Sequence, residues 1–279
     1  MNRIRFDVLI PETGGQMPFT LSHPLAVIPL RRTGLVFSAM VVGCMSPDFE
    51  YMLRPLERSL PLNFDSHASH TLMGLVGICL PTSLFLLWLW HELLKRPLLE
   101  LAPESHRLRL LPLVGEFSFG PSRRFILICL SVLVGAATHV AWDSFTHSWG
   151  WPVRQMPWLQ ERVSLPGIAP LPGYRCLQHA STLLGFFALL LIYGFWFRRT
   201  APVAGPAGTI PPPRRVQLLI IGGTIALVCG LTFSWLRFPL TDPENFRGFV
   251  VRTAVIAMAT TIVQATLFAL WFRFRKLRA

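Results

Sequence analysis

Residues 124–142 read RFILICLSVLVGAATHVAW, and the polar sequence DSFTH follows immediately. The stretch is apolar over about 18 residues, which is the length that an α-helix needs to cross about 30 Å of hydrocarbon. We therefore expect a transmembrane helix here. Its polar end carries His139 and Asp143, and the rest of the sequence has to explain why ionisable groups collect there.

The whole chain has the composition of a membrane protein. Of its 279 residues 52% are hydrophobic and 14% are charged, which is too apolar for an ordinary soluble domain. Scanning for apolar runs long enough to span a bilayer predicts five helices, at 71–94, 124–142, 178–197, 216–236 and 250–272. The sequence thus predicts an all-α integral membrane helical bundle.

A shorter apolar run, GLVFSAMVVGCM at 34–45, ends at Ser46-Pro47. It is too short to span the bilayer, so we expect a re-entrant or interfacial helix. The first 16 residues lack the apolar core of a secretory signal, and Met17 is an alternative start.

Composition also divides the chain. Residues 201–215 are rich in Pro and Gly, which predicts an exposed linker. We expect a domain at 1–200 that carries the polar motifs and three long spans, and a two-span helical hairpin at 216–279.

The basic residues predict an orientation. The chain carries a net charge of +12, and most of this surplus falls in 95–123, 198–215 and the C-terminal tail. Positive residues stay cytoplasmic, so we expect a cytoplasmic C-terminus in a bacterial inner membrane, with the face that receives residues 1–70 turned outward. The basic residues flank spans instead of forming one stripe, which favours contact with anionic membrane lipids over nucleic-acid binding.

Histidine and aspartate gather at the ends of three predicted spans. Alternating spans bring the start of the first, the end of the second and the start of the third to one face. Within the second span the step from 139 to 143 turns a helix by about 40°, so His139 and Asp143 lie one above the other. The candidate metal ligands are His23, Asp48, His67, His70, His139, Asp143, His147 and His179.

Four of these positions also have interpretations without a ligand role. His147 continues the stripe of Asp143 only if the helix continues. Asp48 follows Ser46-Pro47, where an acidic side chain also suits the positive end of a helix. A lone histidine such as His23 or His179 is commonly a hydrogen-bonded packing residue.

An intramembrane carboxylate needs a partner, and a divalent cation bound by imidazoles and carboxylates would supply one. Zn²⁺ accepts both ligand types, whereas Mg²⁺ and Ca²⁺ prefer oxygen. We therefore expect Zn²⁺, with Mn²⁺ or Fe²⁺ as alternatives. Asp48 and Asp143 are the candidate catalytic carboxylates, which would orient an attacking water.

Several motifs together carry a resemblance. The segments MPFTLSHPLAVIPL (17–30), SPDFEY (46–51), HASHT (67–71), THVAWDSFTH (138–147) and LQHAS (177–181) resemble a bacterial membrane family of unknown function with an MPFTLSHP signature. That family is similar in outline to membrane-bound metal-dependent hydrolases. The resemblance implies ligand roles for His23, Asp48, His67 or His70, and His139 with Asp143. An arginine expected near the first histidine pair is replaced in SHASHT.

The sequence leaves two functions open. The first is a metal-dependent hydrolase that acts on a lipid or other phosphoester at the membrane surface. The second is a scaffold or structural metal-binding subunit without catalysis. Serine-hydrolase, nucleotide-binding and zincin motifs do not occur in the sequence.

Overall fold

A computed structural model describes residues 22–50, 68–165, 168–236 and 243–277. Within this part of the chain, helices dominate, and five are long and apolar enough to cross a membrane. The protein is therefore an all-α, multi-pass membrane protein, as its sequence predicts. The five spans are Leu72–Leu99, Ser122–Gln155, Gly173–Arg199, Pro212–Trp235 and Gly248–Arg275.

The first span is a continuous helix assembled from α-helical and π-helical turns. Its elements are α4 (Leu72–Gly74), η6 (Leu75–Cys79), α5 (Leu80–Trp88), η7 (Leu89–Leu94) and α6 (Lys95–Leu99). Helix α7 (Glu104–Leu110) and the turn η8 (Leu111–Val114) lead into the second long helix, α8 (Ser122–Thr146). The short helices α9 (Trp151–Gln155) and α10 (Pro157–Gln160) follow.

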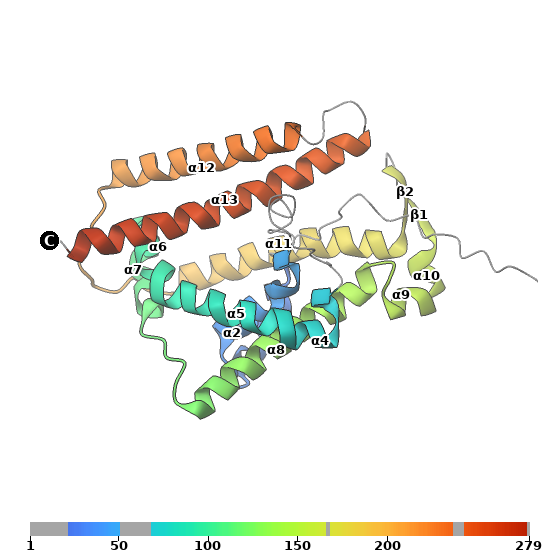
Figure 1. Cartoon of the computed structure of the whole chain (residues 1–279), viewed down its shortest axis with the longest axis horizontal. Coiled ribbons are helices and arrows are strands. Elements are labelled where there is room, and N and C mark those ends of the chain that lie inside the picture. Colours follow the sequence, from blue (N-terminus) through green and yellow to red (C-terminus); the bar gives the residue numbers. More distant parts are fainter. Residues whose placement is uncertain (1–21, 51–67, 166–167, 237–242, 278–279) are drawn as a thin grey trace, which may run out of the picture.

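A small antiparallel β-hairpin precedes the third span. The sequence analysis did not predict it. Its strands are β1 (Arg162–Leu165) and β2 (Ile168–Pro172). Helix α11 (Gly173–Arg199) begins directly after the hairpin, so it starts before the predicted residue 178. Figure 1 shows the hairpin beside α9 and α10, at the end of the molecule where α11 begins.

The last two helices pair with each other. Helices α12 (Pro212–Trp235) and α13 (Pro243–Leu277) run alongside one another in Figure 1. The pair is joined to the first span through Ala269, which is buried with Leu89, Leu93 and Leu94 of η7.

The short apolar run forms α2 (Phe37–Met45), which packs closely against α8. A Cβ atom added to Gly43 would lie 2.2 Å from the carbonyl oxygen of Val132, and one added to Gly135 would lie 2.2 Å from that of Met40. The two backbones can approach this closely because both positions lack a side chain. At the start of α2, the amide of Val36 donates to the hydroxyl of Ser131 at 2.9 Å. That bond satisfies a helix-end donor inside the protein.

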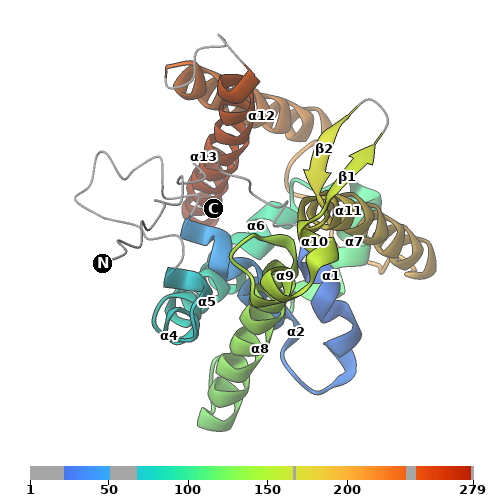
Figure 2. The same cartoon turned by 90° about the vertical axis from the view of Figure 1, so that its right-hand side faces the viewer.

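Helix α2 is the second arm of a helical hairpin. The first arm comprises α1 (Pro24–Val27) and η2 (Ile28–Arg32), and Gly34 makes the turn with a φ of 83°, which glycine adopts without strain. Figure 2 shows this hairpin as the dark blue segment beside α8. Both arms reach the same cluster of polar side chains, because His23 precedes the first and Asp48 ends η3 (Ser46–Asp48) after the second.

The hairpin corrects one expectation about charge. Residues 1–70 were all assigned to the face of the polar motifs, but Arg31 lies beside Arg199 and Thr200 at the end of α11. The turn of the hairpin therefore adds a basic residue to the opposite face. The re-entrant path of the chain is the physical reason for the difference.

Candidate metal centre

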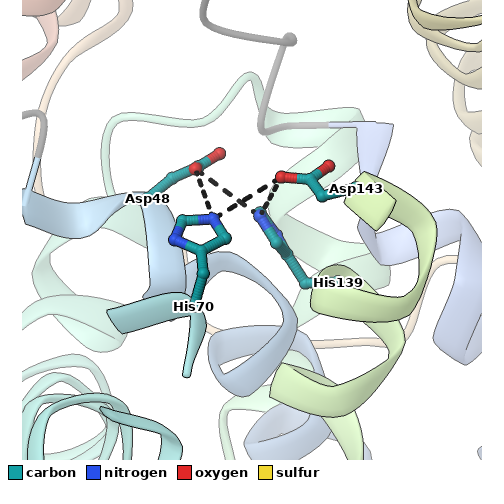
Figure 3. A group of neighbouring side chains, drawn as sticks. All are labelled: Asp48, His70, His139 and Asp143. Atoms are coloured by element: carbon teal, nitrogen blue, oxygen red, sulfur yellow. Dashed lines mark ion pairs between the residues drawn. The ribbon is translucent and has the colours of Figure 1, made fainter. Parts of the chain in front are cut away.

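Four side chains from three segments converge beside the polar end of α8. Asp48 comes from η3, His70 from η5 (Ala68–His70), and His139 and Asp143 from α8. Each offers one ligand atom, and these four atoms all lie within 4.8 Å of one another. Figure 3 shows the two imidazoles pointing toward the space between the two carboxylates. We call Asp48, His70, His139 and Asp143 the tetrad.

Each histidine of the tetrad faces both carboxylates through Nε2. His139 Nε2 lies 3.1 Å from Asp143 Oδ2 and 3.5 Å from Asp48 Oδ1. His70 Nε2 lies 3.5 Å from Asp143 Oδ2 and 3.8 Å from Asp48 Oδ1. The tetrad thus alternates nitrogen and oxygen around a common centre.

The other ring nitrogen of His139 is held by the backbone. Its Nδ1 lies 2.7 Å from the carbonyl oxygen of Cys44, and a carbonyl oxygen only accepts hydrogen bonds. His139 must therefore carry a hydrogen on Nδ1. In the neutral ring Nε2 is then a bare acceptor aimed at carboxylate oxygens.

Ser69 orients His70 in the same way. The hydroxyl of Ser69 donates its one hydrogen to the carbonyl oxygen of Pro47 at 2.9 Å. Its oxygen, 3.1 Å from Nδ1 of His70, consequently accepts from that ring nitrogen. Such outer contacts typically fix the tautomer of a metal-binding histidine and leave Nε2 available to the ion.

Three of the four members of the tetrad are buried, and His70 is half-buried. His139, Asp143 and Asp48 are exposed by 0%, 1% and 2%. His139 Nε2 and Asp143 Oδ1 are buried without a hydrogen-bond partner. Acceptors that face one another in a buried site are unfavourable unless a proton or a cation lies between them. The arrangement is that of a site for a positive charge.

Two further histidines surround Asp143. The ring of His23 stacks on that of His139 with centroids 3.8 Å apart, and its Nε2 lies 3.7 Å from Asp143 Oδ1. Burial, which disfavours the charged imidazole, is the main cause that lowers the pKa of His23 to about 4. His23 is therefore neutral near pH 7.

Helix α8 ends at Thr146, so His147 leaves the helical stripe but stays near the site. His147 Nδ1 lies 3.1 Å from the carbonyl oxygen of Asp143 and 3.9 Å from its Oδ2. On the other side, Gln178 Nε2 donates to His147 Nε2 at 3.3 Å. These two hydrogen bonds hold both ring nitrogens of His147 and fix its imidazole beside the tetrad.

The remaining candidates behave differently. His179 is exposed and is not a member of the tetrad, whereas its neighbour Gln178 is buried and contacts His147. His67 lies outside the described residues. The sequence prediction did not include Gln178, although the motif LQHAS contains it, and it did not include the contact between Ser69 and His70.

Comparison with known proteins places the chain in a family. The profile of a family described as "Domain of unknown function (DUF4184)" matches residues 17–270. The chain belongs to this family. The DUF4184 match covers all four residues of the tetrad as well as His23 and His147. No curated protein matches the chain, and no solved structure matches it either.

Proposed function

We propose that this DUF4184 protein is a membrane-bound metal-dependent hydrolase whose tetrad binds one divalent cation. The observation that carries the proposal is the tautomer of the two tetrad histidines. Both rings use Nδ1 as the donor to a neighbouring oxygen, so both Nε2 lone pairs face the carboxylates of Asp48 and Asp143. A cation at the centre turns these opposed acceptors into ligands.

The spacing of the donor atoms supports cation binding by the tetrad, for a catalytic and for a structural role alike. Zinc bonds to nitrogen and oxygen of about 2.0–2.2 Å place tetrahedral ligand atoms about 3.4 Å apart. The four nitrogen–oxygen distances of the tetrad run from 3.1 to 3.8 Å. Two neutral imidazoles with two carboxylates suit Zn²⁺ best, and Mn²⁺ or Fe²⁺ are the alternatives.

When bound, such an ion supplies Lewis acidity and makes a coordinated water nucleophilic near neutral pH. Asp48 and Asp143 would hold the ion and orient the water. His23 would position the ring of His139, because the two imidazoles stack with centroids 3.8 Å apart.

We further propose a phosphoester substrate presented by the membrane. Trp149 lies beside the rings of His70 and His147, with centroids 6.0 and 5.5 Å away. Trp151 and Trp158 follow nearby and are 65% and 58% exposed. Exposed tryptophans are typical of the membrane interface, so this setting supports a site at the depth of lipid headgroups.

A structural metal site is the second candidate, and the burial of the tetrad favours it. Structural zinc sites are closed by four protein ligands, whereas catalytic sites keep a position open for water. His139 is fully buried and Asp143 almost so. A scaffold of this kind would need the ion for folding and would show no turnover.

For localisation we propose the inner membrane of a bacterium, with a cytoplasmic C-terminus and the tetrad near the outer face. The position of Arg31 beside Arg199 supports this orientation, because it adds to the basic character of the face where α11 ends.

The experiment compares metal content, folding and turnover in the full-length protein purified in detergent. His139→Ala and Asp143→Ala are expected to lose the metal, while the control His179→Ala keeps it, because His179 lies outside the tetrad. Hydrolysis of phosphodiester and phospholipid substrates is measured on the same samples. Metal without any turnover would leave the structural role, and metal-free wild-type protein would refute both proposals.

A further inference from the structure

A groove lies between the helical hairpin and α11, next to the turn of the hairpin. It has a volume of about 470 Å³ and is lined by two arginines, three large apolar side chains and a threonine. The lining residues are Arg31, Ile192, Phe195, Trp196, Arg199 and Thr200. None of them belongs to the tetrad, and the groove plays no part in the function proposed above.

The groove is positively charged. Within the described part of the chain, neither Arg31 nor Arg199 forms an ion pair with a carboxylate, and both are exposed. A third arginine, Arg109, lies nearby, but its Nε already donates to the carbonyl oxygens of Phe197 and Thr200. Those bonds also neutralise the carbonyl end of α11. Arg109 adds positive charge near the groove, but the two guanidinium groups that line it are those of Arg31 and Arg199.

One wall of the groove continues into the surface that faces lipid. Leu184, Phe187, Leu191 and Phe195 follow one another at helical spacing on α11, and they are exposed by 69%, 57%, 62% and 60%. Little of the apolar part of α11 is buried inside the protein. Trp196, beside the two arginines, has the side chain that membrane interfaces favour. A ligand with a charged head and apolar tails matches both parts.

We propose that this groove binds an anionic phospholipid. Its phosphate lies between Arg31 and Arg199, where guanidinium groups offer paired donors to phosphate oxygens. Its acyl chains follow the apolar stripe of α11. Basic pockets between transmembrane helices on the cytoplasmic side commonly hold anionic headgroups, which agrees with the orientation proposed here.

The test is lipid binding to the full-length protein in detergent, measured by native mass spectrometry during titration with phosphatidylglycerol or phosphatidylcholine. The double variant Arg31→Gln/Arg199→Gln is expected to lower the affinity for phosphatidylglycerol about 100-fold, since losing a direct hydrogen bond to a charged group costs about a factor of ten in affinity. Phosphatidylcholine binding changes little. Metal content also stays unchanged, so this result is independent of the function proposed above.

The matched control is Arg32→Gln/Arg198→Gln, which removes the same charge from the adjacent residues of the same two helices. Both are exposed and neither lines the groove. We expect the control to retain phosphatidylglycerol binding. Equal losses in the two double variants would overturn the proposal in favour of diffuse surface charge. Displacement of the lipid by inorganic phosphate at the same concentration would overturn it in favour of a site for free phosphate.

Discussion

Replacing Gly135 by alanine tests whether the contact between α2 and α8 positions the candidate metal site. The new Cβ atom would lie 2.2 Å from the carbonyl oxygen of Met40, whereas ordinary contact begins near 3.4 Å. The clash is with backbone, so no side chain can turn aside. Helix α2 must therefore move away from α8 by about 1.2 Å, the difference between these two distances.

Two opposing energies decide the stability of the variant. Alanine is favoured over glycine in a helix by about 1 kcal/mol. Overpacking a close contact costs about 1–3 kcal/mol. We expect a net loss of up to about 2 kcal/mol, which lowers the melting temperature by a few degrees.

The effect on the metal should be larger than the effect on stability. Asp48 follows α2 directly and moves with it, and ligand positions must hold to within about 0.2 Å. We therefore expect Gly135→Ala to lose most of its bound metal while remaining folded. Thermal unfolding and elemental analysis of the purified variant measure the two effects.

The matched control is Gly194→Ala in α11, where an added Cβ atom meets nothing within 4 Å. That variant should keep its metal and gain up to about 1 kcal/mol of stability from the helix preference of alanine. If Gly135→Ala melts with the control and retains the full metal content, the close contact does not position Asp48 and the reasoning fails.

Two further outcomes are expected. If the metal is present at about 1,000 times its dissociation constant, adding a chelator should lower the free energy of unfolding of the wild type by about 4 kcal/mol. Thermal unfolding with and without chelator measures this change. The Asp143→Ala variant should show no change with chelator. A C-terminal reporter that is active only outside the cytoplasm should stay silent, whereas the same reporter should be active in a fusion that ends after Gln160; a signal from the C-terminus would reverse the orientation.

The spans were readable from the sequence because length and apolarity alone specify them. The proximity of His139 and Asp143 could also be predicted from the sequence, since a spacing of four places two side chains on one face of any α-helix. The hairpin of β1 and β2 was missed, although the dipeptide Pro166-Gly167 between two short runs is a turn signal.

From the sequence we could predict only that Asp48 and His70 lie on the same side of the membrane as the polar end of α8. The position of Asp48 depends on the close contact at Gly43 and Gly135, which joins residues far apart in the sequence. No local pattern gives the path of such a hairpin.

The choice between His179 and Gln178 was a question of helical register. Adjacent residues in a helix point about 100° apart, so an error of one residue exchanges a buried position for an exposed one. Because α11 starts at Gly173 and not at 178, its inward face could not be assigned from the apolar run alone.

The bond between Val36 and Ser131 has a consequence for biosynthesis. Its two partners are 95 residues apart, and ribosomes add about 5–20 residues per second. The amide at the start of α2 therefore waits about 5–20 s for its acceptor to be translated. During that interval a nine-residue apolar helix, too short to span the bilayer, has only the first span and α1 to pack against, as Ala39 does with Leu87 of α5. The close contact of α2 with α8 can form only after α8 has been translated.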